Sequence, residues 1–246
     1  MAIAHAVQQH SDLSRARPPM PLRQTAEPKR NADAGVVPLL PGIATELHRI
    51  GTPVAAARGE EVCAAGSPSD YVYKVVDGTL RVSRLLPDGR RHIASFLMQG
   101  DFFGFADLGD YSYSLEALSD CALIRYPRRR FDAVLEADPQ AGRQMFRLLC
   151  RQFNAANELL MTLSRKTAAE RLATFLLTMI RREAGANSRH VALAMPRVDI
   201  ADHLGLTIET VSRVVTQLRR QKLIDLRGSN EVAILNPDGL EDLAGD

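Results

Sequence analysis

Glycine recurs at a nearly constant interval through the first half of the chain, and this spacing limits the fold more than any other feature. The glycines stand 11 or 12 residues apart, at Gly66, Gly78, Gly89 and Gly100. Between and after them lie short runs rich in β-branched and aromatic residues: YVYKVV (71–76), TLRVSRLL (79–86), HIASFL (92–97) and CALIRYP (121–127). In the second run Leu80 and Val82 alternate with polar residues, which gives one buried and one solvated face. Short strands at this interval predict an antiparallel sandwich or barrel.

The pattern changes after Asp138, because no glycine occurs between positions 143 and 184. Six residues there are separated alternately by four and three positions: Met145, Leu149, Gln152, Ala156, Leu159 and Leu163. A repeat of about 3.5 residues is typical of a two-stranded coiled coil. We predict that this stripe joins two subunits, the alternative being an ordinary buried helix face. The neighbouring face, with Phe146, Cys150 and Phe153, is expected to pack against the chain's own β domain.

A helix-turn-helix pattern follows a break at 164–167 and a second amphipathic helix. The segment VDIADHL (198–204) places Ile200 and Leu204 on one face, and Gly205 then permits a tight turn. Thr207 is expected to cap the next helix through its hydroxyl. Pro196 stands where a capping serine or threonine is common, but proline suits a first helical turn, so we expect this helix to form.

Two apolar runs around residues 228–230, LIDLRG and EVAIL, predict a hairpin behind the two helices. A helix-turn-helix followed by a hairpin is a winged helix, whose second helix enters the major groove of double-stranded DNA. No membrane-spanning run of about 20 apolar residues and no secretory signal occur, so we expect a cytoplasmic protein.

The exposed residues of the second helix predict how a duplex is read. Arg213 can donate twice to guanine, Glu209 can accept from cytosine, and Ser212 can reach a base edge or methyl group. The alternative for Glu209 and Arg213 is a surface ion pair at i, i+4, which is compatible with base contact. Phosphate contacts are predicted for other polar residues on and after this helix: Thr207, Thr210, Arg219, Arg220, Lys222 and Arg227.

Composition and residue spacing argue against several kinds of functional site. The 31 Lys and Arg against 29 Asp and Glu give a net charge of +2, so any signal for nucleic acid must be local. The three cysteines, Cys63, Cys121 and Cys150, show no metal-ligand spacing, and we interpret all three as core residues. Histidines are dispersed and no nucleophile–base pair or phosphate-binding loop is present. We therefore predict no catalytic residue, no metal site and no cofactor.

These observations predict an α+β protein with four parts. Residues 1–38, rich in proline and without periodicity, are expected to be a disordered tail. A β-roll is expected over 39–136, a dimerisation helix over 137–165 and a winged-helix DNA-binding domain over 166–246.

The order of β-roll, long helix and winged helix resembles the CRP/FNR superfamily of bacterial transcription regulators, over roughly residues 40–240. GLTIETVSR (205–213) contains the E-x-x-S-R motif of the FNR/FixK branch, and RKTAAERLATFLL (165–177) also resembles that branch. The resemblance implies a homodimeric activator of microaerobic, anaerobic or nitrogen-metabolism genes. It also implies that Glu209, Ser212 and Arg213 read a TTGA-type inverted repeat, and that loops such as 106–111 contact RNA polymerase.

The sequence departs from this superfamily where relatives bind an effector. Phe105 stands where cyclic-nucleotide binders have a glutamate, and Tyr111 stands about where they have an arginine. Two aromatic residues do not neutralise a phosphate, so cyclic-nucleotide binding is not expected. Residues 1–62 contain no cysteine, which argues against an iron–sulfur cluster. The pattern is FixK-like, without a built-in sensor; the alternative is a ligand- or redox-gated regulator with another effector in the β-roll.

Overall fold

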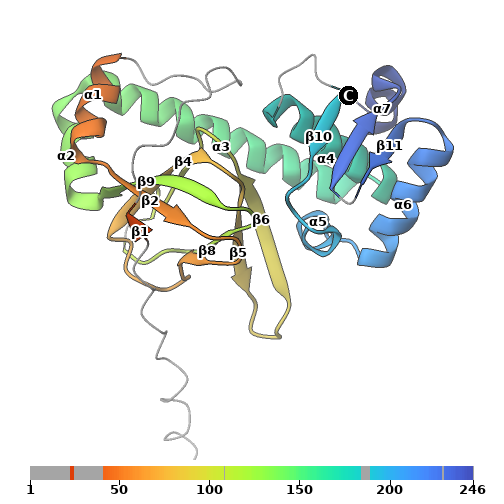
Figure 1. The fold of residues 1–246 in the computed structure, drawn as a ribbon, viewed down its shortest axis with the longest axis horizontal. Coiled ribbons are helices and arrows are strands. Elements are labelled where there is room, and N and C mark those ends of the chain that lie inside the picture. Colours follow the sequence, from red (N-terminus) through yellow and green to blue (C-terminus); the bar gives the residue numbers. More distant parts are fainter. Residues whose placement is uncertain (1–22, 25–40, 108, 184–188, 229, 246) are drawn as a thin grey trace, which may run out of the picture.

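A computed structural model describes residues 23–24, 41–107, 109–183, 189–228 and 230–245. In chain order it contains a β-roll, one long helix and a small C-terminal domain of helices and strands (Figure 1). This arrangement confirms the predicted α+β class. Of the predicted tail, only β1 (Arg23–Gln24) is described, and it pairs antiparallel with Ala55 and Val54. The other residues of 1–38 lie outside the described part of the chain.

Two antiparallel sheets face each other in the β-roll. The first has the strand order β1-β2-β9-β4-β7 and contains β2 (Thr52–Ala56), β9 (Cys121–Pro127), β4 (Tyr71–Asp77) and β7 (Phe102–Phe103). The second has the order β3-β8-β5-β6 and contains β3 (Glu61–Cys63), β8 (Ser114–Ala117), β5 (Leu80–Leu85) and β6 (Arg91–Leu97). All four predicted runs are strands, namely β4, β5, β6 and β9. Their inward side chains, such as Val75, Leu80 and Leu123, contribute to the buried core.

Three helices cover the outer face of the five-stranded sheet: α1 (Pro41–Ile50), α2 (Arg128–Ala137) and the first turns of α3 (Pro139–Arg165). Phe131 of α2 and Met145 of α3 share an apolar cluster with Phe102 and Tyr126 of the sheet. Asp138 caps α3 by accepting a hydrogen bond from the Gln140 backbone N–H at 2.8 Å, and Pro139 occupies its first turn. Helix α3 then runs from the β-roll to the C-terminal domain (Figure 1).

The α3 stripe predicted to join two subunits is exposed at Leu149, Gln152 and Ala156, but its first residue is buried. Met145 is buried in its own β-roll, and the Gln152 amide donates to the Phe102 carbonyl at 3.2 Å. Phe146 and Phe153 are each 65% exposed, and Cys150 is also exposed. The expectations that these three residues pack against the β domain and that Cys150 is a core residue are therefore wrong. Adjacent residues lie about 100° apart around a helix, so Phe146, Cys150 and Phe153 lie on a different face of α3 from the predicted stripe.

The C-terminal domain combines four helices with a three-stranded sheet. The helices are α4 (Ala168–Glu183), α5 (Arg197–Leu204), α6 (Ile208–Arg220) and α7 (Pro237–Ala244). The sheet has the order β10-β12-β11, with β10 (His190–Ala192), β12 (Glu231–Ile234) and β11 (Ile224–Arg227). The predicted hairpin is β11–β12, whereas β10 and α7 had not been predicted. In the described part of the chain, no helix is both long and apolar enough to cross a membrane.

Candidate nucleic-acid interface

The turn between α5 and α6 has the geometry that the sequence predicts. Helix α5 follows Pro196 and forms without a side-chain cap, as expected. Gly205 ends it in the left-handed region, with φ +61°, which favours glycine because it has no Cβ. The Leu206 backbone N–H donates to the Ala201 carbonyl at 2.9 Å and closes the turn. The chain then enters α6 after only three residues, Gly205 to Thr207, which holds the two helices in one unit.

Helix α6 has one buried face and one exposed face. The Thr207 hydroxyl accepts a hydrogen bond from the Thr210 backbone N–H at 3.2 Å, which confirms the predicted cap. Val211, Val214 and Leu218 are buried against the rest of the domain. Because residues three and four apart share a helix face, this buried side leaves Glu209, Arg213, Thr216 and Arg220 exposed to solvent.

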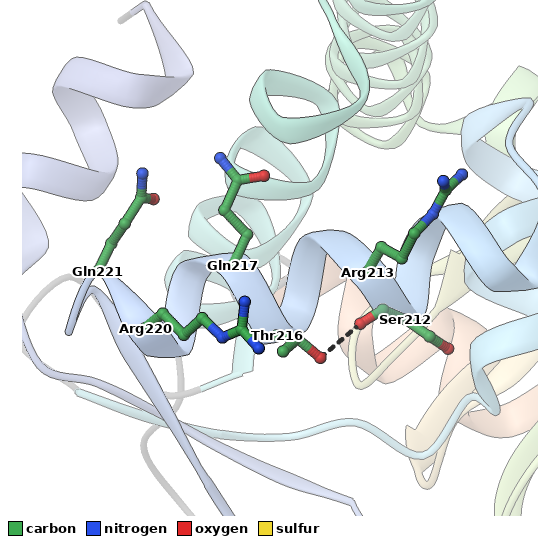
Figure 2. Close-up of a pocket in the computed structure, with 6 residues that line it drawn as sticks. All are labelled: Ser212, Arg213, Thr216, Gln217, Arg220 and Gln221. Carbon is green, nitrogen blue, oxygen red and sulfur yellow. Dashed lines mark hydrogen bonds between the residues drawn. The ribbon is translucent and has the colours of Figure 1, made fainter.

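The exposed face carries two parallel rows of polar side chains (Figure 2). One row is Ser212, Thr216 and Arg220; the other is Arg213, Gln217 and Gln221. Together the six residues line a shallow groove of about 590 Å³. Thr216, Gln217 and Gln221 had not been predicted as part of this surface. Their i, i+4 spacing from Ser212 and Arg213 was the available signal.

The charged groups at the start of α6 are held by local hydrogen bonds. The pKa of the Glu209 carboxyl lies below its ordinary value because its own backbone N–H and the Thr207 side chain donate to it, with Arg213 adding attraction. Glu209 is therefore ionised at neutral pH. The Arg213 guanidinium donates to the Thr210 hydroxyl at 3.3 Å. The carboxylate and the guanidinium thus come from positions one turn apart at the start of the helix, and each is held by a threonine hydroxyl.

The six predicted phosphate contacts fall in three places. Thr207 and Thr210 lie at the start of α6, with their hydroxyls 3.1 Å apart. Arg220 lies in the groove, whereas Arg219 is half exposed and pairs with Asp225 of β11 at 3.4 Å. Lys222 and Arg227 are exposed beyond the helix. Among the described residues no carboxylate pairs with Arg220, whereas Arg219 is paired with Asp225.

Aromatic side chains fill the β-roll around Tyr111, one of the two positions where the sequence argued against a phosphate-binding site. Tyr111 is 3% exposed, and its hydroxyl donates to the Tyr71 carbonyl at 2.6 Å. Its ring stacks on Phe103 at 5.6 Å between centroids. Burial raises the pKa of the Tyr111 hydroxyl well above its usual value, so the group stays neutral. A tyrosine side chain carries no positive charge, so Tyr111 cannot neutralise an anionic ligand as an arginine would.

Neither the cysteines nor the acidic residues form a metal centre in the described ranges, where no group of three or more His, Cys, Asp or Glu side chains could hold an ion. Cys63 and Cys121 are buried, and burial raises the pKa of both thiols. A raised pKa lowers the fraction of reactive thiolate. Cys150 alone of the three is exposed.

Two family models match the chain. Residues 170–243 match a Crp-like helix-turn-helix domain, and residues 53–138 match a cyclic nucleotide-binding domain. The first match contains α5, α6 and the wing, and the second contains most of the β-roll.

Several characterised proteins are similar over most of the chain. The nitrogen fixation regulation protein FixK of Azorhizobium caulinodans is 39% identical over 230 residues, covering 92% of this chain and 91% of that protein. The transcriptional activator protein FnrL of Cereibacter sphaeroides is 32% identical, covering 76% and 78%. Among solved structures, FixK2 from Bradyrhizobium japonicum superposes with a TM-score of 0.75 at 36% identity, covering 79% of this chain and 97% of that one.

Proposed function

This chain belongs to the FixK-like branch of the CRP/FNR family of transcription regulators, and from that premise we propose that it binds a TTGA-type inverted repeat as a homodimeric activator. The observation that carries the proposal is the exposed face of α6, on which Glu209, Ser212 and Arg213 lie within two turns of a capped helix. In a major groove Arg213 would donate to the guanine of TTGA and Glu209 would accept from a cytosine N4 amino group. Ser212 would contact a thymine.

The direct test is binding at about 0.15 M salt to a TTGA inverted repeat and to a scrambled duplex of equal length, measured by fluorescence anisotropy. We expect the repeat to be preferred by at least about a thousandfold, as is usual for specific regulators. Equal affinity for both duplexes would contradict the proposal. The salt concentration must be stated, because phosphate contacts dominate at low salt.

We propose that the two subunits join along the exposed stripe of α3. Phe146, Cys150, Phe153 and Leu160 follow one another at spacings of four, three and seven residues. The three large apolar residues of this stripe are each 65% exposed, which leaves them uncovered in a single subunit. Of the predicted stripe, Met145 and Gln152 contact their own β-roll, while Leu149 and Ala156 are exposed. The proposed seam therefore has the predicted spacing, but each of its residues lies one position after its predicted counterpart.

The shifted seam predicts a cross-link between subunits. In a parallel dimer the two Cys150 residues face each other across the two-fold axis, at a separation suited to a disulfide. Mild oxidation is expected to give a covalent dimer on a non-reducing gel, and Cys150→Ser is expected to remove it. Cys63 and Cys121 are buried and serve as internal controls. A dimer that stays uncross-linked under these conditions would contradict this phase of the seam.

We assign phosphate binding chiefly to Arg220, because it lies in the groove beside the base-reading residues. Arg220→Ala is expected to weaken binding to the repeat and to the scrambled duplex by the same factor. The slope of log affinity against log salt should fall by about one for each phosphate that the variant no longer neutralises. Arg219→Ala is the matched control and should weaken binding less, because the Asp225 carboxylate already offsets part of the Arg219 charge. A decrease confined to the repeat would instead make Arg220 a base reader.

We propose that cyclic nucleotides do not control this protein, although the β-roll matches a cyclic nucleotide-binding domain. The support is Tyr111, whose hydroxyl and ring are committed to Tyr71 and Phe103 inside the roll. Calorimetric titration with cyclic AMP and cyclic GMP is expected to give no saturable heat. A binding isotherm with either nucleotide would favour the ligand-gated alternative.

Within this proposal the parts of the chain have separate roles. Residues 39–136 form the β-roll, whose loop around 106–111 would face RNA polymerase, and residues 137–165 join the subunits. Residues 166–246 bind DNA in the cytoplasm.

A further inference from the structure

Helix α5 packs against α6 on one face and against the β-roll on the other. Ile200, Ala201 and Leu204 are buried in the cluster that also contains Val211 and Val214 of α6. The opposite face carries acidic and imidazole groups that reach across to the β-roll: Asp199, Asp202 and His203. Residues three and four apart share a helix face, so this short helix lies between α6 and strand β6. Any tilt of α5 relative to the β-roll therefore tilts α6.

Two arginines of the β-roll converge on one carboxylate of α5. Asp199 is 0% exposed, and Arg81 donates to one of its oxygens at 2.8 Å. Arg91 donates to the other oxygen. Arg91 also binds Asp202, with its Nε at 3.0 Å and its Nη2 at 2.8 Å from the same oxygen. Glu116 of β8 holds the second nitrogen of Arg81 at 2.7 Å.

The two arginines orient α5 as well as attracting it to the β-roll. Asp199 lies in the first turn of α5, where the helix dipole favours a negative charge. Guanidinium groups are planar forks, so they donate to a carboxylate in only a few directions. Removing one partner of a buried charge leaves the other uncompensated, which penalises every displaced arrangement.

Apolar and aromatic contacts extend the same interface. Phe96 of β6 packs against His203 at 5.3 Å and against Phe175 of α4 at 6.1 Å between ring centroids. His203 Nδ1 lies 3.1 Å from the Ile93 carbonyl, and burial lowers the pKa of its imidazole. Arg182 of α4 donates to the Phe96 carbonyl at 2.9 Å and pairs with Asp101. The winged helix is thus fixed to the β-roll by side chains from both α4 and α5.

We propose that Arg81 and Arg91 are positioning residues for DNA binding. They touch no base and no phosphate; through Asp199 and Asp202 they hold α5, and with it α6, in one orientation relative to the β-roll. In a homodimer this sets the separation of the two α6 helices, which must match half-sites one helical turn apart. The inference rests on the proposed function, because it presumes a dimer that reads an inverted repeat.

The test compares two neighbouring arginines in the full-length protein. Arg91→Ala removes the contact with Asp199 and Asp202. Arg90→Ala removes an equal charge from a side chain that is 78% exposed and whose ion pair, among the described residues, is with the neighbouring Asp88. Both variants should bind a scrambled duplex more weakly by the same small factor. On the inverted repeat, Arg91→Ala is expected to bind about tenfold more weakly than Arg90→Ala, because the competent orientation becomes a minor population.

A second readout separates positioning from loss of folding. Inserting one base pair between the half-sites should penalise wild type strongly and Arg91→Ala much less, since a loosened domain adapts to the new spacing. Asp199→Asn, which keeps the side-chain volume, should show the same relaxed spacing preference. Thermal unfolding of each variant identifies the fraction folded at the assay temperature.

The outcomes are distinct. If wild type itself does not prefer the repeat, the proposed function fails. If wild type does prefer it but Arg91→Ala and Asp199→Asn match Arg90→Ala in affinity and spacing preference, only the positioning role is overturned. Tighter binding by Arg91→Ala would also overturn it, because the contact would then hold α6 away from DNA.

Discussion

Arg213→Ala is expected to lower affinity for the TTGA inverted repeat by at least about thirtyfold. One bidentate arginine–guanine contact is worth about 1–3 kcal/mol, and a homodimer on a symmetric site makes it twice. The side chain lies on the exposed face of α6, so its removal leaves the helix and its buried face intact. Titration by fluorescence anisotropy on the matched duplex measures the decrease.

The control for Arg213 is a repeat in which the guanine of each half-site is replaced. Wild type should bind this duplex more weakly, while Arg213→Ala should bind both repeats alike, because its guanine contact is already absent. Arg220→Ala provides the contrast, since it is expected to keep the preference for guanine. If Arg213→Ala fell below wild type by the same factor on the matched and replaced repeats, direct readout would be rejected.

Phe153→Glu is expected to convert the dimer to a monomer and to reduce binding of the repeat to the non-specific level. The substitution would place two carboxylates opposite each other in the apolar seam of α3, where desolvation and like charge both oppose association. A monomer reads one half-site, so its affinity should fall to about 10⁻⁴–10⁻⁶ M at physiological salt. Sedimentation velocity and anisotropy measure the two effects.

The matched control is Ala155→Glu, which adds the same charge two residues away. Ala155 is exposed, and at about 100° per residue it points well away from Phe153 around the helix. This variant should remain a dimer and retain specific binding. A dimeric Phe153→Glu, or a monomeric wild type, would place the subunit contact elsewhere.

The local structure of the exposed α6 surface followed from the sequence because it depends on near neighbours. Gly205 adopts the predicted turn, Thr207 caps α6, and Val211 with Leu218 forms its inner face. Capping, positive φ and a 3.6-residue period act within a few residues, so they leave a readable pattern. The same holds for β4, β5, β6 and β9, whose turns and alternation are also local.

Which face of α3 packs against the β-roll could not be predicted from such local patterns. Two apolar stripes run along this helix one residue apart, and periodicity gives their spacing without saying which covers the β-roll. Met145 fits among Phe102, Tyr126 and Phe131, which arrive from distant parts of the chain. Phe153 consequently remains exposed, although the sequence predicted that it would pack against the β domain.

By itself, then, the sequence determined the strands β4, β5, β6 and β9, the helix-turn-helix with its hairpin, and the exposure of Glu209 and Arg213 on α6, since each depends on contacts between close neighbours. Only the tertiary structure decided which face of α3 is left uncovered and how the winged helix is held. Arg81 and Arg91 meet Asp199 across more than a hundred residues of chain. No local pattern marks such a pairing, because it exists only once two separately folded units have packed together.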